Sequence, residues 1–204
     1  MSKVLVTESY LSDIGNAIRS KNGGSTKYKP SEMAAAIKSL TGGSGQDNTV
    51  LNSILDRSIS GDYVNDDLTE IGEYAFSYCE NLASATFMKA TKVCKYAFES
   101  TTSLKSISLP EVKTIEALAF NWSSLTSINM PRIETLSDDG SYWGVFCYCP
   151  ITTINIPSTI KSIGENAFKN TNNLTSITIN RKKDAISGYP WGATNATVSW
   201  MGTT

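Results

Sequence analysis

The chain has 204 residues, of which 40% are hydrophobic and 18% charged, so it can form a folded core and is not a disordered chain. Eighteen basic residues against nineteen acidic ones leave a net charge of -1, which argues against nucleic acid or an anionic membrane as a partner. No apolar stretch is long enough for a signal peptide or a membrane span, so we expect synthesis in the cytoplasm and no membrane insertion. Four cysteines are too few for a disulfide scaffold, and the lack of histidine removes the commonest general base.

Residues 1–45 form a first module in which two short amphipathic helices are expected between residues 7 and 40, before a flexible Gly-Ser linker at 42–45. Pro30 is a favoured first residue for the second helix. The apolar faces of this helical hairpin are too small for a stable core, so they should pack on each other, on a second copy of the chain or on a larger assembly. The expected attachment residues are Leu11, Ile14, Ile18, Met33, Ile37 and Leu40.

A repeat of about 22 residues occupies residues 68–180, after an N-terminal cap expected at 46–67. Its most visible element is an Ala-Phe or Val-Phe pair, with phenylalanines at 76, 98, 120, 146 and 168. An aliphatic residue precedes most of these pairs, and an L-x-x-I-x-L phrase with the two-residue period of a strand follows each. A period near 22 predicts a solenoid of about five coils, with one parallel strand per coil and the phenylalanines stacked in the core.

The phrases IGEYAFSYCENL (71–82) and IGENAFKNTNNL (163–174) resemble the BspA-like class of leucine-rich repeats. The resemblance implies a leucine-rich-repeat solenoid, and together with the predicted hairpin it gives an α+β fold. It indicates the function only weakly, because repeats of this class occur in adhesins, phage proteins and many surface molecules.

Two terminal phrases resemble parts of phage tail proteins. LSDIGNAIRSKNGGSTKYKPSEMAAAIKSL (11–40) is similar to a helical module of tail and tail-fibre proteins from phages and prophages of Gram-positive bacteria. ISGYPWGATNATVSW (186–200), within the C-terminal cap expected at 181–204, is similar to the last phrase of phage tail-associated proteins. The two resemblances imply a tail-fibre-like protein located in the virion.

The reactive residue types are expected to be structural. Cys79 and Cys149 follow a repeat phenylalanine by three residues, where other coils have Thr or Ser, and Cys94 takes a position held elsewhere by glycine. Asp66-Asp67 and Asp138-Asp139-Gly140 lack the D-x-D-x-D spacing of a calcium loop, so they predict turns. We therefore expect no catalytic residue, no metal and no cofactor.

Exposed aromatic residues are the better candidates for recognition. Tyr78, Trp122 and Tyr148 each follow a repeat phenylalanine by two residues, and Tyr142 and Trp143 lie in an insertion in the fourth coil. Alternatively, these rings only cover the seam between coils. A second candidate is the Ser, Thr and Asn residues that flank the strand interior on the sheet face, from Ser84 and Thr86 to Ser176 and Thr178.

These observations predict a non-enzymatic protein that binds a host cell-surface protein or glycan, or another virion component. Attachment to other tail components, and homo-oligomerisation, would occur through residues 1–45. The alternative is a secreted or cell-surface BspA-like adhesin. A third class, a glycan-cleaving enzyme, would need paired carboxylates in a cleft, which the repeats do not contain.

Overall fold

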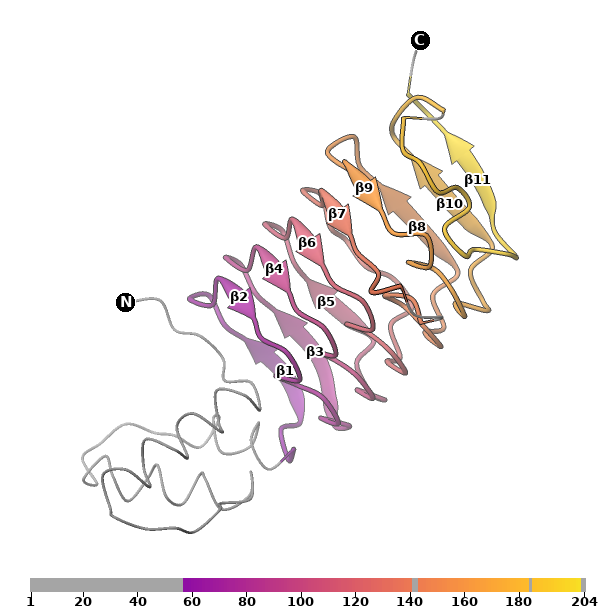
Figure 1. The fold of residues 1–204 in the computed structure, drawn as a ribbon. Helices are drawn as coiled ribbons and strands as arrows, with labels where there is room; N and C mark the ends of the chain where they lie inside the picture. The colour runs from indigo at the N-terminus through magenta and orange to yellow at the C-terminus, as the bar shows by residue number, and fades with distance from the viewer. Residues whose placement is uncertain (1–56, 141–142, 184, 203–204) are drawn as a thin grey trace, which may run out of the picture.

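A computed structural model describes residues 57–140, 143–183 and 185–202. They form a solenoid in which each turn of the chain lies beside the next (Figure 1). All strand pairs are parallel and join neighbouring coils, as the 22-residue repeat predicts. The helical hairpin and the six attachment residues lie outside the described residues, which contain no helix.

One side of the solenoid is formed by the L-x-x-I-x-L phrases. Its strands are β1 (Gly61–Val64), β3 (Leu82–Thr86), β5 (Ser106–Ser108), β8 (Thr153–Ile156), β10 (Ser176–Ile179) and β11 (Thr197–Trp200). They pair in the orders β1-β3-β5 and β8-β10-β11, and an isolated bridge from Ser108 to Asn129 continues the pairing into the third coil. The Ile of each phrase, or Ala85 in β3, points inward, while its neighbours in the strand are half-buried or exposed.

A second parallel sheet lies on another side and corrects the prediction of one strand per coil. Its strands are β2 (Glu70–Ile71), β4 (Lys92–Val93), β6 (Thr114–Ile115), β7 (Thr135–Leu136) and β9 (Ser162–Ile163), in the order β2-β4-β6-β7-β9. Each has only two residues, too few to show an alternating pattern in the sequence. These strands form because stacking brings the same backbone segment of successive coils into register.

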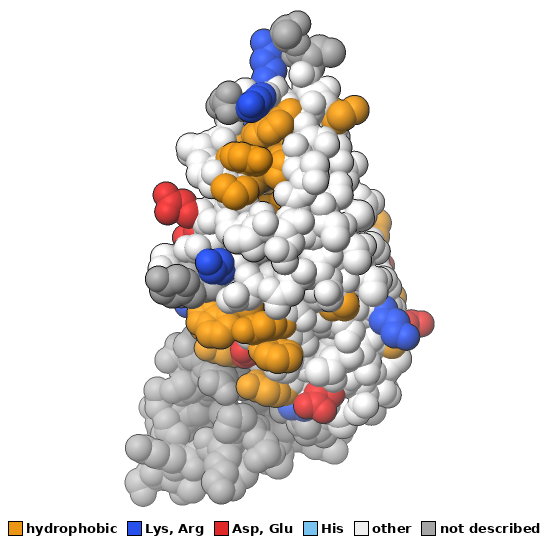
Figure 2. Space-filling view, turned by 90° about the vertical axis from the view of Figure 1, so that its right-hand side faces the viewer, with side chains coloured by type: hydrophobic (Ala, Val, Ile, Leu, Met, Phe, Trp, Pro, Cys, Tyr) orange, Lys and Arg blue, Asp and Glu red, His pale blue; other side chains and the backbone are white. Residues whose placement is uncertain are grey.

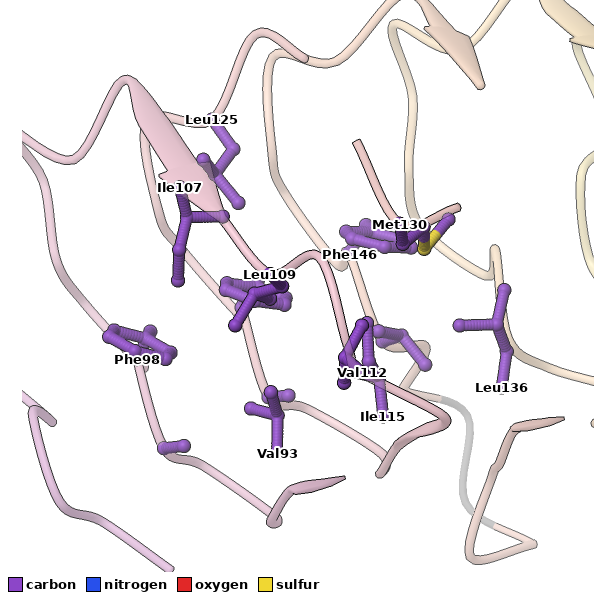
Figure 3. Packing of buried hydrophobic residues seen from close by; sticks show 14 of the residues in the cluster. Val93, Phe98, Ile107, Leu109, Val112, Ile115, Leu125, Met130, Leu136 and Phe146 are labelled. Atoms are coloured by element: carbon purple, nitrogen blue, oxygen red, sulfur yellow. The ribbon is translucent and has the colours of Figure 1, made fainter. Parts of the chain in front are cut away.

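The core between the two sheets contains the predicted Phe ladder, which consists of Phe76, Phe98, Phe120, Phe146 and Phe168. The centroids of successive rings are 5.1, 5.3, 5.7 and 6.2 Å apart, and their planes differ by no more than 8°. Phe87 packs edge-on against Phe76 and Phe98. Aliphatic side chains such as Val93, Leu109 and Ile115 point into the same space from successive coils (Figure 3). The ladder therefore links the core of each coil to that of the next.

Small polar residues form a second buried ladder, three positions after each phenylalanine. Its members are Cys79, Thr101, Ser123, Cys149 and Thr171, all at most 5% exposed. The Thr101 hydroxyl donates to the Phe98 carbonyl at 2.7 Å, and the Cys149 thiol donates to the Phe120 carbonyl at 2.9 Å. The role predicted for Cys79 and Cys149 as small buried residues is thus confirmed, and these side chains satisfy carbonyl groups in the turns.

The C-terminal phrase builds a further coil beyond the five predicted. β11 continues the sheet through its pairing with β10. Trp191 is fully buried as part of the hydrophobic core, and its carbonyl accepts a hydrogen bond from the Phe168 amide at 3.0 Å. Its ring also lies 5.9 Å from that of Trp200. The last coil therefore covers the end of the core with a large aromatic residue.

Candidate functional site

The turn that follows each short strand carries most of the predicted contact residues. We define the turn-edge column as the residues two positions after each phenylalanine of the ladder: Tyr78, Ser100, Trp122, Tyr148 and Asn170. All five have a left-handed backbone, with φ between 54° and 60°. The amides of the first four donate to a carbonyl of the next coil, for example Trp122 to Cys147 at 2.9 Å and Tyr148 to Asn170 at 3.0 Å. This conformation costs an L-residue other than Gly or Asn about 1 kcal/mol, yet three of the five residues are aromatic.

Three of the predicted contact residues form a cluster at this edge. The ring of Trp122 stacks on that of Tyr148 at 4.4 Å, and the ring of Trp143 contacts Tyr148 at 5.9 Å. We call Trp122, Trp143 and Tyr148 the aromatic cluster. Trp122 is 55% exposed and Trp143 is 42% exposed, while Tyr148 between them is half-buried. The insertion in the fourth coil thus brings Trp143 to the same surface as the turn-edge column.

The other two predicted contact residues are not part of this cluster. Tyr78 is 54% exposed but lies two coils before Trp122, with Ser100 between them. Tyr142 lies outside the described residues. Figure 2 shows a face of the molecule on which hydrophobic side chains gather in two patches, separated by mainly uncharged surface. Exposed apolar residues gathered in this way are a common feature of interaction surfaces.

A second aromatic pair in the same turns was missed in the sequence. Tyr74 and Tyr96, two positions before the phenylalanine, stack at 4.7 Å with their planes 8° apart. The Lys95 ammonium lies 5.0 Å from the centre of the Tyr96 ring and pairs with Asp139. The spacing of 22 residues between the two tyrosines could have indicated this stacked pair in the sequence.

The cysteines lack the properties of nucleophiles. All four lie within the described residues, none forms a disulfide, and all are buried. Burial raises the pKa of Cys149 to about 12 and that of Cys147 to about 11. Burial, followed by a hydrogen bond to Glu70, also raises the pKa of Cys94 to about 12. These thiols are therefore protonated at neutral pH, whereas a reactive cysteine needs a lowered pKa.

The two carboxylate clusters have structural partners. Asp138 accepts hydrogen bonds from the Asn166 amide at 2.7 Å and the Gly140 amide at 3.1 Å, so it joins the insertion to the next coil. Asp67 pairs with Lys89 at 3.7 Å. No group of three or more His, Cys, Asp or Glu side chains in the described part of the chain could hold a metal ion. This supports the interpretation of both clusters as turns.

A family model for the BspA type leucine-rich repeat region matches residues 58–142 and 140–197, in six copies. The chain belongs to the BspA-type leucine-rich repeat family. The match extends through the C-terminal coil and leaves out residues 1–57.

A solved structure supports the fold assignment. The leucine-rich repeat protein of T. pallidum superimposes with a TM-score of 0.57 and 21% sequence identity, over 70% of each chain. At this identity the similarity concerns the fold alone. A comparison with functionally curated proteins finds no significant match. Within the residues that the structure describes, no helix is long and apolar enough to cross a membrane.

On this BspA-type solenoid the second predicted surface is the outer face of the long strands. Ser84 and Thr86 of β3 pair with Ser106 and Ser108 of β5, and Ser176 and Thr178 of β10 continue the rows at the other end. Ser84 also donates to Asp62 at 2.6 Å. This face is mainly polar and carries short side chains, with Val64 of β1 as an exposed apolar exception, whereas the turn edge carries large exposed rings. The aromatic cluster is therefore the stronger candidate for a binding site.

Proposed function

We propose that this protein is a non-enzymatic, adhesin-like recognition protein whose aromatic cluster binds a component of a host cell surface. The observation that carries the proposal is the exposure of Trp122 and Trp143 around the half-buried ring of Tyr148. Tryptophan and tyrosine supply large contact areas at a low cost in side-chain entropy, and they dominate the energetics of many interfaces.

The backbone of the turn-edge column supports the same proposal. Trp122 and Tyr148 have a left-handed backbone, which asparagine adopts more readily than an aromatic residue does. Asn170 occupies the equivalent position in the fifth coil, so the fold accepts asparagine there. The rings of Trp122 and Tyr148 contact each other rather than a ring of the Phe ladder, and neither residue belongs to the buried core cluster. Stacking between the two rings returns roughly 0.5–1.5 kcal/mol, which offsets only part of the backbone cost. A role in binding accounts for large aromatic residues at these positions.

We further propose that the protein is carried on a phage tail through residues 1–45. The support is the resemblance of residues 11–40 and 186–200 to phrases of phage tail proteins, and the Gly-Ser linker that follows the first of them. The family match begins after this segment, so the repeats alone account for the solenoid.

A binding assay on whole cells tests the recognition role. The labelled chain is applied to a panel of Gram-positive cells and compared by flow cytometry with a Trp122→Ala/Trp143→Ala double variant. Tyr189→Ala is the matched control, because Tyr189 is 57% exposed but lies in the last coil. We expect at least a tenfold loss for the double variant and no change for the control. Equal binding by all three proteins, or no binding by the unmodified chain, would contradict the proposal.

Removal of residues 1–45 tests the attachment role. The truncated chain should keep the thermal midpoint of the solenoid and bind cells as before, because it retains every residue of the Phe ladder and of the aromatic cluster. It should lose self-association in light scattering, or lose capture by purified phage tails. If both chains are monomers and neither binds tails, residues 1–45 are not an attachment module.

A further inference from the structure

We propose that Tyr78, Ser100 and Trp122 form a slot that holds one pyranose ring of a neutral carbohydrate. The inference rests on the proposed recognition role and names the ligand class. It concerns the first three coils of the turn-edge column, whereas the cell-binding proposal concerns the aromatic cluster of the third and fourth coils.

The three residues present their side chains in parallel. Their φ angles are 60°, 54° and 57°, and their amides donate to the next coil at 2.8, 2.8 and 2.9 Å. Because backbone conformation and register repeat, the Cα–Cβ bonds leave the turn in the same direction. Tyr78 and Trp122 therefore stand as two walls with the short Ser100 side chain between them.

The width of the slot follows from the spacing of the coils. The Phe rings of the first three coils are 5.1 and 5.3 Å apart, so positions two coils apart are separated by about 10 Å. Tyr148 stacks on Trp122 from the side of the fourth coil, which leaves the opposite face of the indole turned toward Ser100. Tyr78 makes no ring contact with another described residue. Both walls are more than half exposed, so a ligand can enter from solvent.

This width suits a puckered sugar ring. Carbon atoms in contact lie about 3.5–4.0 Å apart, so a flat group between two rings needs roughly 7–8 Å. A pyranose chair directs axial C–H bonds at both walls and adds about 1 Å on each side, which brings the requirement to roughly 9–10 Å. These C–H groups are weakly positive, as the electron-rich ring faces prefer.

The polar groups of the slot also favour a neutral sugar. None of the three side chains carries a charge, and the Ser100 hydroxyl has no hydrogen-bond partner among the described residues. An inserted peptide would bury several amide groups against this single hydroxyl, which is unfavourable. A pyranose would leave most of its equatorial hydroxyls in water and direct one of them at Ser100.

Saturation-transfer NMR on the full chain tests the slot, with N-acetylglucosamine and cellotetraose as probes. In both sugars H3 and H5 lie on one face of the ring, together with H1 in the β anomer, and H2 and H4 lie on the other face. A ring held between two aromatic walls should receive saturation on both faces. A ring stacked on one exposed aromatic residue should receive it on one face only, and that result would overturn the proposal.

Three variants complete the test. Tyr78→Ala and Trp122→Ala should each weaken binding of the probe at least tenfold. Ser100→Tyr should abolish it, because the new ring fills the slot at a position where the first coil already accepts tyrosine. Tyr189→Ala is the control and should bind normally. Unchanged binding by Ser100→Tyr, or no saturation of either probe, would show that the slot inference is wrong. The proposed recognition role would still stand if cell binding continued to depend on Trp122 and Trp143.

Discussion

The phenylalanine of each coil and the residue two positions later obey opposite constraints. Phe98 is fully buried between two parallel rings, and its size is fixed by the 5.1 and 5.3 Å spacing to its neighbours. Ser100 is the turn-edge residue of the same coil, and only its backbone conformation is constrained. The equivalent residue in other coils is Tyr, Trp or Asn. Stability therefore depends on the ladder residue, while the turn-edge residue is available for recognition.

Phe98→Ala should lower the free energy of unfolding by about 3–5 kcal/mol, because it removes one ring of the Phe ladder and leaves a cavity between Phe76 and Phe120. Urea unfolding measures the change, with the exposed Lys105→Ala as the control. A Phe98→Ala protein as stable as the unmodified chain would disprove the stacked core.

The buried thiol of Cys149 should make stability fall at high pH. Burial raises its pKa in the folded protein to about 12, while the exposed thiol of the unfolded chain has its ordinary value of 9.0. Between these values the unfolded chain loses a proton that the folded protein retains, so the pH rise favours unfolding. The stabilisation present below pH 9 should fall by about 1.4 kcal/mol at pH 10.

Cys149→Thr isolates this effect, because Thr101 and Thr171 occupy the same ladder. With a reductant present, the stability lost between pH 7 and pH 10 should be about 1.4 kcal/mol smaller in the variant than in the unmodified chain. An identical loss in both proteins would show that this thiol titrates normally in the fold.

At the scale of elements, the insertion in the fourth coil is accommodated by a glycine. A Cβ added to Gly144 would lie 2.6 Å from the carbonyl oxygens of both Asn166 and Ala167 in the next coil. The first two coils have Tyr74 and Tyr96 at this position in a left-handed conformation, which Gly144 does not adopt. The inserted residues thus change the backbone conformation at the start of the turn. The backbone at Gly144 then packs directly against the turn of the next coil.

Gly144→Ala should therefore destabilise the protein by about 2 kcal/mol or more, because the added methyl group forces two backbone segments apart. Gly140→Ala is the comparison: its Cβ would meet no atom within 4 Å, and only its φ of 76° is unfavourable for alanine. That control should cost about 1 kcal/mol. Thermal unfolding of both variants measures the difference, and equal midpoints would contradict the close approach of the coils.

The features that could be predicted from the sequence are those that repeat with the coil. The Phe ladder, the buried Cys79 and Cys149 and the inward Ile of the long strands all recur at about 22 residues, so an alignment of the chain with itself finds them. The two-residue strands such as β2 were missed because pairing, rather than side-chain pattern, creates them. The contact of Trp143 with Tyr148 depends on the path of an insertion, which has no counterpart in the other coils.

At the scale of the whole molecule, the stacking of coils makes the protein nearly one-dimensional. Each strand pairs only with those of adjacent coils, and the described chain runs from β1 at one end to β11 at the other (Figure 1). A substitution in one coil therefore perturbs the two adjacent coils and has little effect on more distant ones. This separation lets the turn edge vary from coil to coil without loss of the fold.

The direction of the backbone hydrogen bonds has a mechanical consequence. They run along the axis from coil to coil. A force that pulls the two ends apart should therefore break the hydrogen bonds between one pair of coils before those between the next pair, instead of all of them at once. The coils should open in sequence from an end, and each 22-residue coil should lengthen the chain by about 70 Å. Single-molecule stretching would show this as a series of small, evenly spaced steps, whereas one rupture to full length would contradict it. A protein built in this way behaves as an extensible tether: under tension one coil unfolds and lengthens the chain while the remaining coils stay folded.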